Sequence, residues 1–219
     1  MHLMKHGETI ERTVQFVKEQ LAGAEGGHDW WHIYRVWKNA RKIAEGEHAD
    51  MLVVELAALL HDIADAKFHG GDEDKGPAIA GEFLASIQVG QDTITRVQDI
   101  IRNISFKGGN DNPVSRSREL DIVQDADRLD AIGAIGIARA FSYGGYKNRG
   151  LYDPSVKPQL NMSKEEYRNS NAPTINHFYE KLFLLKDRMN TATGRRMAGE
   201  RHHFMQEYVD RFYREWEGE

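Results

Sequence analysis

The sequence predicts an all-α protein, and three observations support this prediction. Apolar residues recur at helical spacing through most of the 219 residues, and no stretch of useful length alternates as a β-strand does. Residues 52–66 contain neither Gly nor Pro and are apolar almost all round, which predicts a buried helix. Segments rich in Gly, Pro and polar residues separate the periodic stretches, as loops between helices do.

The helices can be placed in order from their apolar spacing and their start signals. Asp29 and Asp92 are suited to capping the helices that follow them, and Pro77 suits the first turn of another. A long helical stretch is expected to break near Gly133 or Gly136. We expect helices at about residues 9–21, 29–45, 50–66, 77–87, 92–104 and 119–141, and two more between 173 and 216.

The length of the chain suits one large domain or two small ones, with enough residues to bury a core. We interpret residues 1–219 as a single domain, with its motifs between about 28 and 140 and its C-terminal helices at 173–216. Residues 142–172 are rich in Gly, Pro, Asn and Tyr and show no clear period. So long a connection is expected to be either a functional lid or disordered.

Composition excludes several classes of function. The net charge of −5 offers no basic field for a nucleic-acid backbone, so we expect no nucleic-acid partner. The absence of cysteine excludes disulfides and thiolate metal sites. The N-terminus lacks the apolar core of a signal peptide, and the longest apolar run is too short to span a membrane. We therefore expect a cytoplasmic protein that does not act at a membrane.

Polar residues interrupt the C-terminal half of the predicted buried helix. His61, Asp62 and Asp65 lie within one turn of each other, so one helix would present an imidazole and two carboxylates together. Burying a carboxylate costs several kcal/mol unless a partner or a metal compensates it. Taken alone, these residues are equally compatible with a helix end that emerges into water.

Two further stretches supply similar side chains. His32 opens the second helix, and Asp127 belongs to an otherwise apolar helix that carboxylates again interrupt. Any one of these residues is more often structural than functional. Together with His61 and Asp62, however, they would form a mixed nitrogen and oxygen site, which suits divalent ions such as Mn, Fe, Co, Ni or Zn.

The order of these motifs resembles that of the HD-domain metal-dependent phosphohydrolases. The matching parts are His-Ile-Tyr-Arg-Val at 32–36, His-Asp at 61–62 and Ala-Asp-Arg-Leu-Asp at 126–130. The stretches 28–32 and 124–139 are similar to a small single-domain bacterial group, the YpgQ/YedJ-like proteins. The resemblance implies an all-α HD-domain helical bundle with additional C-terminal helices. It also implies that the metal ligands are His32, His61, Asp62 and Asp127.

The resemblance further implies one divalent metal ion, with Mn, Ni, Co, Fe, Zn and Mg as the candidates. Some relatives hold more than one ion with extra histidines, and residues 99–107 contain none. Asp65 would be the catalytic residue that transfers a proton; otherwise it orients a ligand histidine. Several relatives carry Glu at that position. For each substrate-binding candidate a solvated surface charge is the alternative: these candidates are His28, Arg35, Lys67 and Lys107.

The leading interpretation is hydrolysis of a small phosphorylated metabolite, with a nucleotide as the expected partner. The group resemblance points to release of pyrophosphate from nucleoside or deoxynucleoside triphosphates. The alternatives are a nucleoside 5′-monophosphate phosphatase at the same site and a non-catalytic nucleotide sensor. For Trp30 and Trp31 we favour core packing over stacking on a base. A homodimer is compatible with the sequence.

Overall fold

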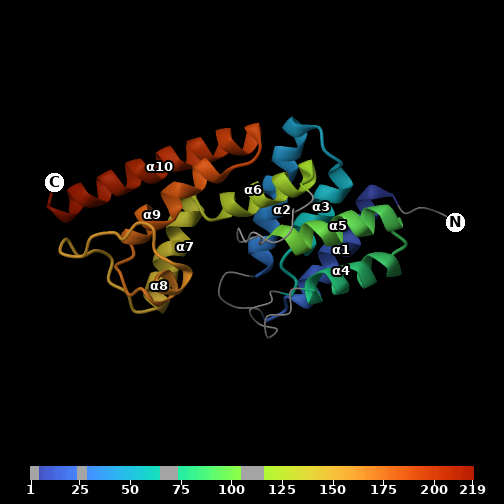
Figure 1. The fold of residues 1–219 in the computed structure, drawn as a ribbon, viewed down its shortest axis with the longest axis horizontal. Coiled ribbons are helices and arrows are strands. Elements are labelled where there is room, and N and C mark those ends of the chain that lie inside the picture. The colour runs from blue at the N-terminus through green and yellow to red at the C-terminus, as the bar shows by residue number, and fades with distance from the viewer. Residues whose placement is uncertain (1–4, 24–28, 65–73, 105–115) are drawn as a thin grey trace. The chain divides into compact units, whose positions relative to one another are not determined.

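The computed structural model describes residues 5–23, 29–64, 74–104 and 116–219 (Figure 1). All regular structure in these ranges is helical, so the prediction of an all-α fold is confirmed. The chain divides into two compact units, Met1–Asp127 and Arg128–Glu219, which are described separately. Within the described ranges, no helix combines the length and apolar character needed to cross a membrane.

The first unit is organised around the predicted buried helix. Its helices are α1 (His6–Gln20), α2 (Trp30–Glu47), α3 (Met51–Leu60), α4 (Lys75–Ser86), α5 (Gln91–Ile104) and α6 (Arg118–Asp130), the last of which ends in the second unit. The central helix α3 contacts α1, α2 and α5. All of its residues from Val53 to Leu60 are buried, and Asp50 caps its N-terminus by accepting from two backbone N–H groups.

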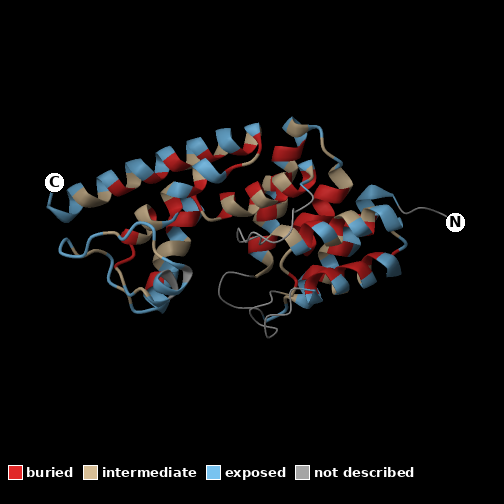
Figure 2. Ribbon diagram, viewed as in Figure 1, coloured by how far each residue is buried: buried red, intermediate tan, exposed pale blue. Residues whose placement is uncertain are grey.

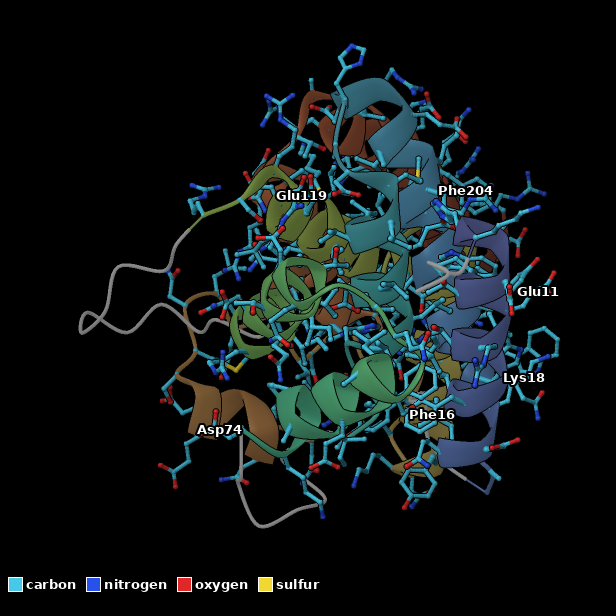
Figure 3. The ribbon with its side chains drawn as sticks, turned by 90° about the vertical axis from the view of Figure 1, so that its right-hand side faces the viewer. Glu11, Phe16, Lys18, Asp74, Glu119 and Phe204 are labelled. Carbon is cyan, nitrogen blue, oxygen red and sulfur yellow. The ribbon has the colours of Figure 1, made fainter. Side chains whose placement is uncertain are left out.

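Helix α4 packs against α5 on one side of this unit. Phe16 of α1 stacks on Phe83 of α4, with ring centroids 4.0 Å apart (Figure 3). In the same view Glu11 and Lys18 point outward from α1. Pro77 lies in the first turn of α4 as predicted. Helix α5 begins at Gln91, so Asp92 lies inside its first turn and does not precede the helix.

Helix α3 is shorter than predicted, whereas the predicted break near Gly133 or Gly136 is confirmed. Helix α3 ends at Leu60, several residues before the expected end at 66. The His61 ring bonds to the carbonyl of Ala58, which in a continuing helix would pair with the N–H of Asp62. The expected helix at 119–141 is divided into α6 and α7 by Gly133, whose φ of 75° leaves the helical region.

The second unit packs its helices around aromatic side chains. The helices of this unit are α7 (Gly133–Tyr146), α8 (Lys164–Asn169), α9 (Asn176–Glu180), the 3-10 helix η2 (Leu182–Arg188) and α10 (Ala192–Trp216). Helix α10 contacts α7 and η2, and Figure 2 shows buried residues along one side of α10 with exposed residues opposite. Phe178 is fully buried and stacks on Tyr208 with centroids 6.2 Å apart.

The long connection predicted at 142–172 begins inside α7 and contains α8. The residues that follow this segment are bonded back to its first half: the N–H of Thr174 donates to the Gly150 carbonyl, and the N–H of Ile175 donates to the Leu151 carbonyl. A role of this segment as a lid remains a prediction. The helix expected to follow it is divided at Lys181, where the backbone leaves helical dihedrals between α9 and η2.

Candidate metal centre

Helix α2 places the imidazole of His32 in the interior of the first unit. Asp29 caps the helix as predicted, because its Oδ1 accepts from the N–H of His32 at 2.9 Å. His32 lies in the first turn and on the inward side of α2 with Val36, and only 4% of its surface is exposed. The cap therefore holds the backbone of the residue that carries this buried imidazole.

The C-terminal end of α3 brings a second imidazole to the same place. Nδ1 of His61 lies 2.9 Å from the carbonyl oxygen of Ala58. A carbonyl oxygen can only accept, so Nδ1 donates this hydrogen bond, and in the neutral imidazole the lone pair is then on Nε2. A backbone carbonyl that orients a histidine in this way is typical of metal ligands, because it leaves the other nitrogen free to bind an ion.

Helix α6 is anchored at several points that together position Asp127. At its start, Glu119 accepts from Arg96 at 3.2 Å and from the N–H of Asp50 at 3.2 Å (Figure 3). Farther along, the Gln124 side chain donates to backbone carbonyls at the end of α5. Asn39 of α2 donates to the Ala126 carbonyl at 3.4 Å. These bonds hold the turn that carries Asp127 against the other helices of the first unit.

The predicted ligands converge in the first unit. His32 Nε2 lies 3.6 Å from Asp127 Oδ1 and 4.0 Å from Asp62 Oδ2. The rings of His32 and His61 are 5.4 Å apart between centroids. His32, His61 and Asp127 each offer a ligand atom within 4.8 Å of the others. Atoms that share one transition-metal ion lie roughly 3–4 Å apart, so small side-chain movements suffice for three ligands, with Asp62 beside them.

The exposure of these side chains corrects one expectation. We expected the carboxylates to be buried, but the side chain of Asp62 is 15% exposed and that of Asp127 is 44% exposed, against 6% for His32. Helix α3 ends before Asp62, which brings that carboxylate to the end of the helix and closer to water. The cluster of predicted ligands is therefore shielded from solvent at His32 and accessible to solvent at Asp127, and a catalytic metal site needs such an accessible side.

Comparison with known proteins agrees with this geometry. A family model described as the HD domain matches residues 30–132, which include all four predicted ligands. YpgQ of Bacillus subtilis, a protein called uncharacterized, is 40% identical over 210 residues, covering 95% of this chain and 93% of YpgQ. The chain belongs to the HD-domain family. As an HD-superfamily hydrolase it is a phosphohydrolase, and enzymes of this family depend on metal ions.

Solved structures support the same assignment along the whole chain. An HD-superfamily hydrolase from Bacillus thuringiensis superimposes with a TM-score of 0.81 at 40% identity, covering 98% of this chain and all of that one. B. subtilis YpgQ in complex with ADP gives a TM-score of 0.75 at 35% identity, covering 97% of each chain. The fold beyond the HD motifs is therefore shared with these relatives.

The other predicted site residues of this HD domain are placed only in part. Arg35 is described, is half-buried and lies one turn after His32 on α2. The remaining candidates lie outside the described residues: they are His28, Asp65, Lys67 and Lys107. The tryptophans differ from the favoured prediction, because Trp31 is 61% exposed and does not pack in the core, whereas Trp30 is half-buried.

Sequence reasoning missed a second polar cluster on α3. Glu55 is 5% exposed, and its carboxylate accepts from Trp37 Nε1 at 2.8 Å and contacts His6 Nε2 at 2.6 Å. Arg41 Nε lies 3.3 Å from the same carboxylate. The signal was visible, since Glu55 is the one acidic residue among the apolar positions 51–60.

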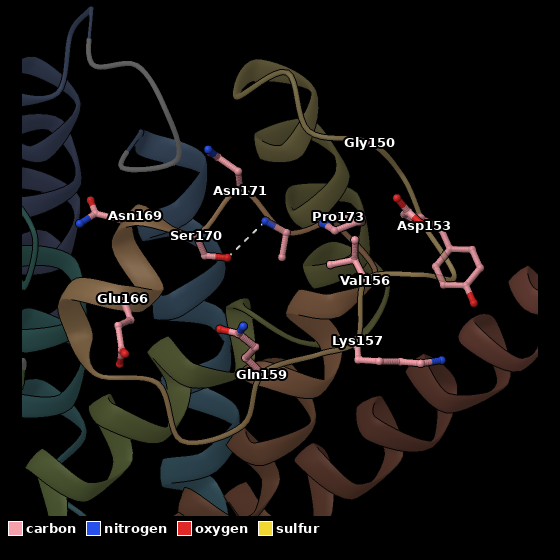
Figure 4. A pocket seen from close by; sticks show the side chains of 12 residues that line it. Gly150, Asp153, Val156, Lys157, Gln159, Glu166, Asn169, Ser170, Asn171 and Pro173 are labelled. Carbon is pink, nitrogen blue, oxygen red and sulfur yellow. Dashed lines mark hydrogen bonds between the residues drawn. The ribbon is translucent and has the colours of Figure 1, made fainter.

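The second unit contains a hollow whose described carboxylates, Asp153 and Glu166, bond to neighbouring residues of their own loop. It has a volume of about 740 Å³ and is lined by residues from 150–159 and 166–173 (Figure 4). Asp153 accepts from the N–H and hydroxyl of Ser155, and these bonds lower the pKa of the Asp153 carboxyl. Ser170 accepts from the N–H of Ala172, drawn as a dashed line in Figure 4. These polar groups stabilise turns of their own loop.

His177 shows a different environment for an imidazole in the second unit. Burial, together with the positive charges of Lys181 and Arg149, lowers the pKa of His177 to about 4. A neutral imidazole beside two cations is a poor place for a metal ion. The carboxylates around His32 provide the opposite surroundings.

Proposed function

We propose that this protein hydrolyses small phosphorylated metabolites with one divalent ion held by His32, His61, Asp62 and Asp127. The observation that carries the proposal is the convergence of ligand atoms from His32, His61 and Asp127 within 4.8 Å. Three separate helices contribute to it, so its formation depends on the fold and not on one local motif. The partly exposed Asp127 leaves a side from which substrate can approach.

The donor set limits the choice of ion. Two imidazoles with two carboxylates favour Mn, Fe, Co, Ni or Zn, whereas Mg prefers oxygen ligands and water. Nδ1 of His61 is occupied by the Ala58 carbonyl, so His61 would bind through Nε2. His32 Nε2 faces both Asp62 and Asp127, which makes it the nitrogen directed at the same ion.

A bound divalent ion would lower the pKa of the attacking water and polarise a phosphoryl oxygen. The four ligand side chains would hold that ion, and His32 is the most buried of them. We assign proton transfer to Asp65, which follows Asp62 by three residues. Arg35, one turn after His32, is assigned to the substrate phosphates. His28, Lys67 and Lys107 complete the proposed phosphate-binding set.

Nucleoside and deoxynucleoside triphosphates are the proposed substrates, with pyrophosphate as the released product. Support comes from the relative YpgQ, whose structure was determined in complex with ADP. A phosphate chain offers several anionic oxygens to a metal and to arginine at once, which suits a half-open site of this kind.

The test is a turnover screen of nucleoside mono-, di- and triphosphates against Mn, Co, Ni, Fe, Zn and Mg. Pyrophosphate and orthophosphate are measured separately, so that the bond cleaved is identified. We expect pyrophosphate from triphosphates with a transition-metal ion, and loss of turnover with a chelator. Orthophosphate from monophosphates would indicate the phosphatase instead. Tight nucleotide binding without turnover under any ion would contradict the proposed catalysis and indicate a sensor.

A further inference from the structure

Aromatic side chains line the outward side of the first half of α2. Trp31 and Tyr34 meet edge to face with centroids 6.0 Å apart, and Tyr34 meets Trp37 in the same manner at 6.1 Å. Trp31 is 61% exposed and Tyr34 is 36% exposed. Adjoining exposed aromatic rings offer a flat apolar surface on which a planar ligand can stack.

Trp31 differs from its aromatic neighbours in what covers it. Lys18 Nζ lies 4.9 Å above the ring of Trp30, and Lys38 lies within 5.9 Å of the rings of Tyr34 and Trp37. Among the residues that the structure describes, no cation lies over Trp31. Most of its ring is therefore available to a ligand, while Tyr34 supports one side of it.

The position of Trp31 relative to the metal centre suggests the ligand. Trp31 directly precedes His32, and adjacent residues point about 100° apart around a helix. Arg35, one turn later, falls between those two directions, at about 40° from Trp31. Around α2 the order is thus aromatic ring, cation, metal-binding imidazole. A nucleotide likewise has its base at one end and its phosphates at the other, so a base on Trp31 would place the phosphates toward Arg35 and His32.

We propose that Trp31 is the residue on which the substrate base stacks, with Tyr34 holding its ring in place. This inference rests on the proposed nucleotide hydrolysis and names its base-binding residue. Stacking on a π-face tolerates every base, so the site would accept different bases, with purines favoured for their larger ring area. Specificity would then come from the phosphate chain more than from the base.

The test compares ligands that differ only in carrying a nucleoside. Binding of ADP and of inorganic pyrophosphate is measured by calorimetry with Mn²⁺ for the wild type, Trp31→Ala and Trp31→Phe. We expect Trp31→Ala to weaken ADP binding by about five- to 150-fold, the range for loss of one base stack. Its effect on pyrophosphate should be less than about twofold by the same argument, and Trp31→Phe should recover most of the ADP affinity.

Trp216→Ala is the matched control, since Trp216 is another exposed tryptophan, 46% accessible, on α10. It should change neither affinity. Equal weakening of both ligands by Trp31→Ala, no weakening of ADP, or a wild type that binds neither ligand would each overturn the inference. Binding of ADP through Trp31 without hydrolysis of any nucleotide would refute the proposed function alone, because the binding measurement needs no turnover.

Discussion

Helix α3 carries two polar clusters, and they solve the same electrostatic problem in different ways. The carboxylate of Glu55, in the middle of the helix, is contacted by the side chains of Trp37, Arg41 and His6, so protein donors surround it. At the C-terminal end, His61 lies with His32 and Asp127, and Asp62 lies 4.0 Å from His32, so two imidazoles and two carboxylates gather among the described residues.

This difference is the reason for treating one cluster as structural and proposing the other as a metal site. A carboxylate with an indole N–H and a guanidinium beside it is already compensated and has no need of an ion. A group of two histidines and two carboxylates is compensated by a divalent cation, which is what such ligands bind. The kinds of side chain that surround each carboxylate thus distinguish two clusters that look alike in the sequence, where both are polar residues in an apolar helix.

The largest effect is expected when a carboxylate of the proposed metal site is removed. Asp62→Ala and Asp127→Ala should each lower bound metal well below one ion per chain and reduce turnover by roughly 10³-fold, because the ion supplies several kcal/mol of transition-state stabilisation. Elemental analysis and phosphate release measure the two effects. Asp121→Ala is the control, as Asp121 is also on α6 but pairs with Arg116. Full metal occupancy in both variants would refute the ligand assignment.

The next effect separates proton transfer from metal binding. Asp65→Asn keeps the shape of the side chain but removes its basicity, so kcat should fall by roughly 10²–10⁴-fold at unchanged metal content. Elemental analysis and steady-state kinetics on the best nucleotide test this. Retention of more than about a third of kcat would mean that another group or solvent transfers the proton, since general-base loss costs far more.

A smaller effect is expected from the donor-rich cluster. Glu55→Gln keeps an acceptor for Trp37 but removes the charge that faces Arg41, so the protein should lose roughly 1–2 kcal/mol of stability. We expect a lower denaturation midpoint with metal content and kcat unchanged. Loss of the metal at full stability would show that the two clusters are not independent.

The smallest effect concerns the histidine that joins α1 to this cluster. The side chain of His6 is 46% exposed, so His6→Gln should cost less than about 1 kcal/mol, as exposed pairs do. Urea denaturation of His6→Gln beside Glu55→Gln ranks the two contributions. A larger loss for His6→Gln would identify His6 as the main partner of Glu55.

Periodicity and motif order determined much of this protein in advance. The all-α class, the Asp29 cap of α2, the buried α3 and the break at Gly133 depend on local rules of spacing, capping and backbone freedom, which a sequence displays directly. The HD motifs predict four ligand positions because their residue types and order are specific, and the HD family model covers all four.

Tertiary structure decided what depends on neighbours distant in the chain. The exposure of Asp127 and Trp31 and the partners of Glu55 follow from how helices pack. An amphipathic pattern tells which side of a helix is apolar, but not which side chain of another helix meets it. Glu55 is compensated because α1 and α2 place three donors beside it. His32 faces Asp62 because α3 ends just before that residue, and it faces Asp127 because α6 passes beside it. Each cluster is a product of packing, since electrostatic compensation acts over a few ångströms in space and not along the sequence.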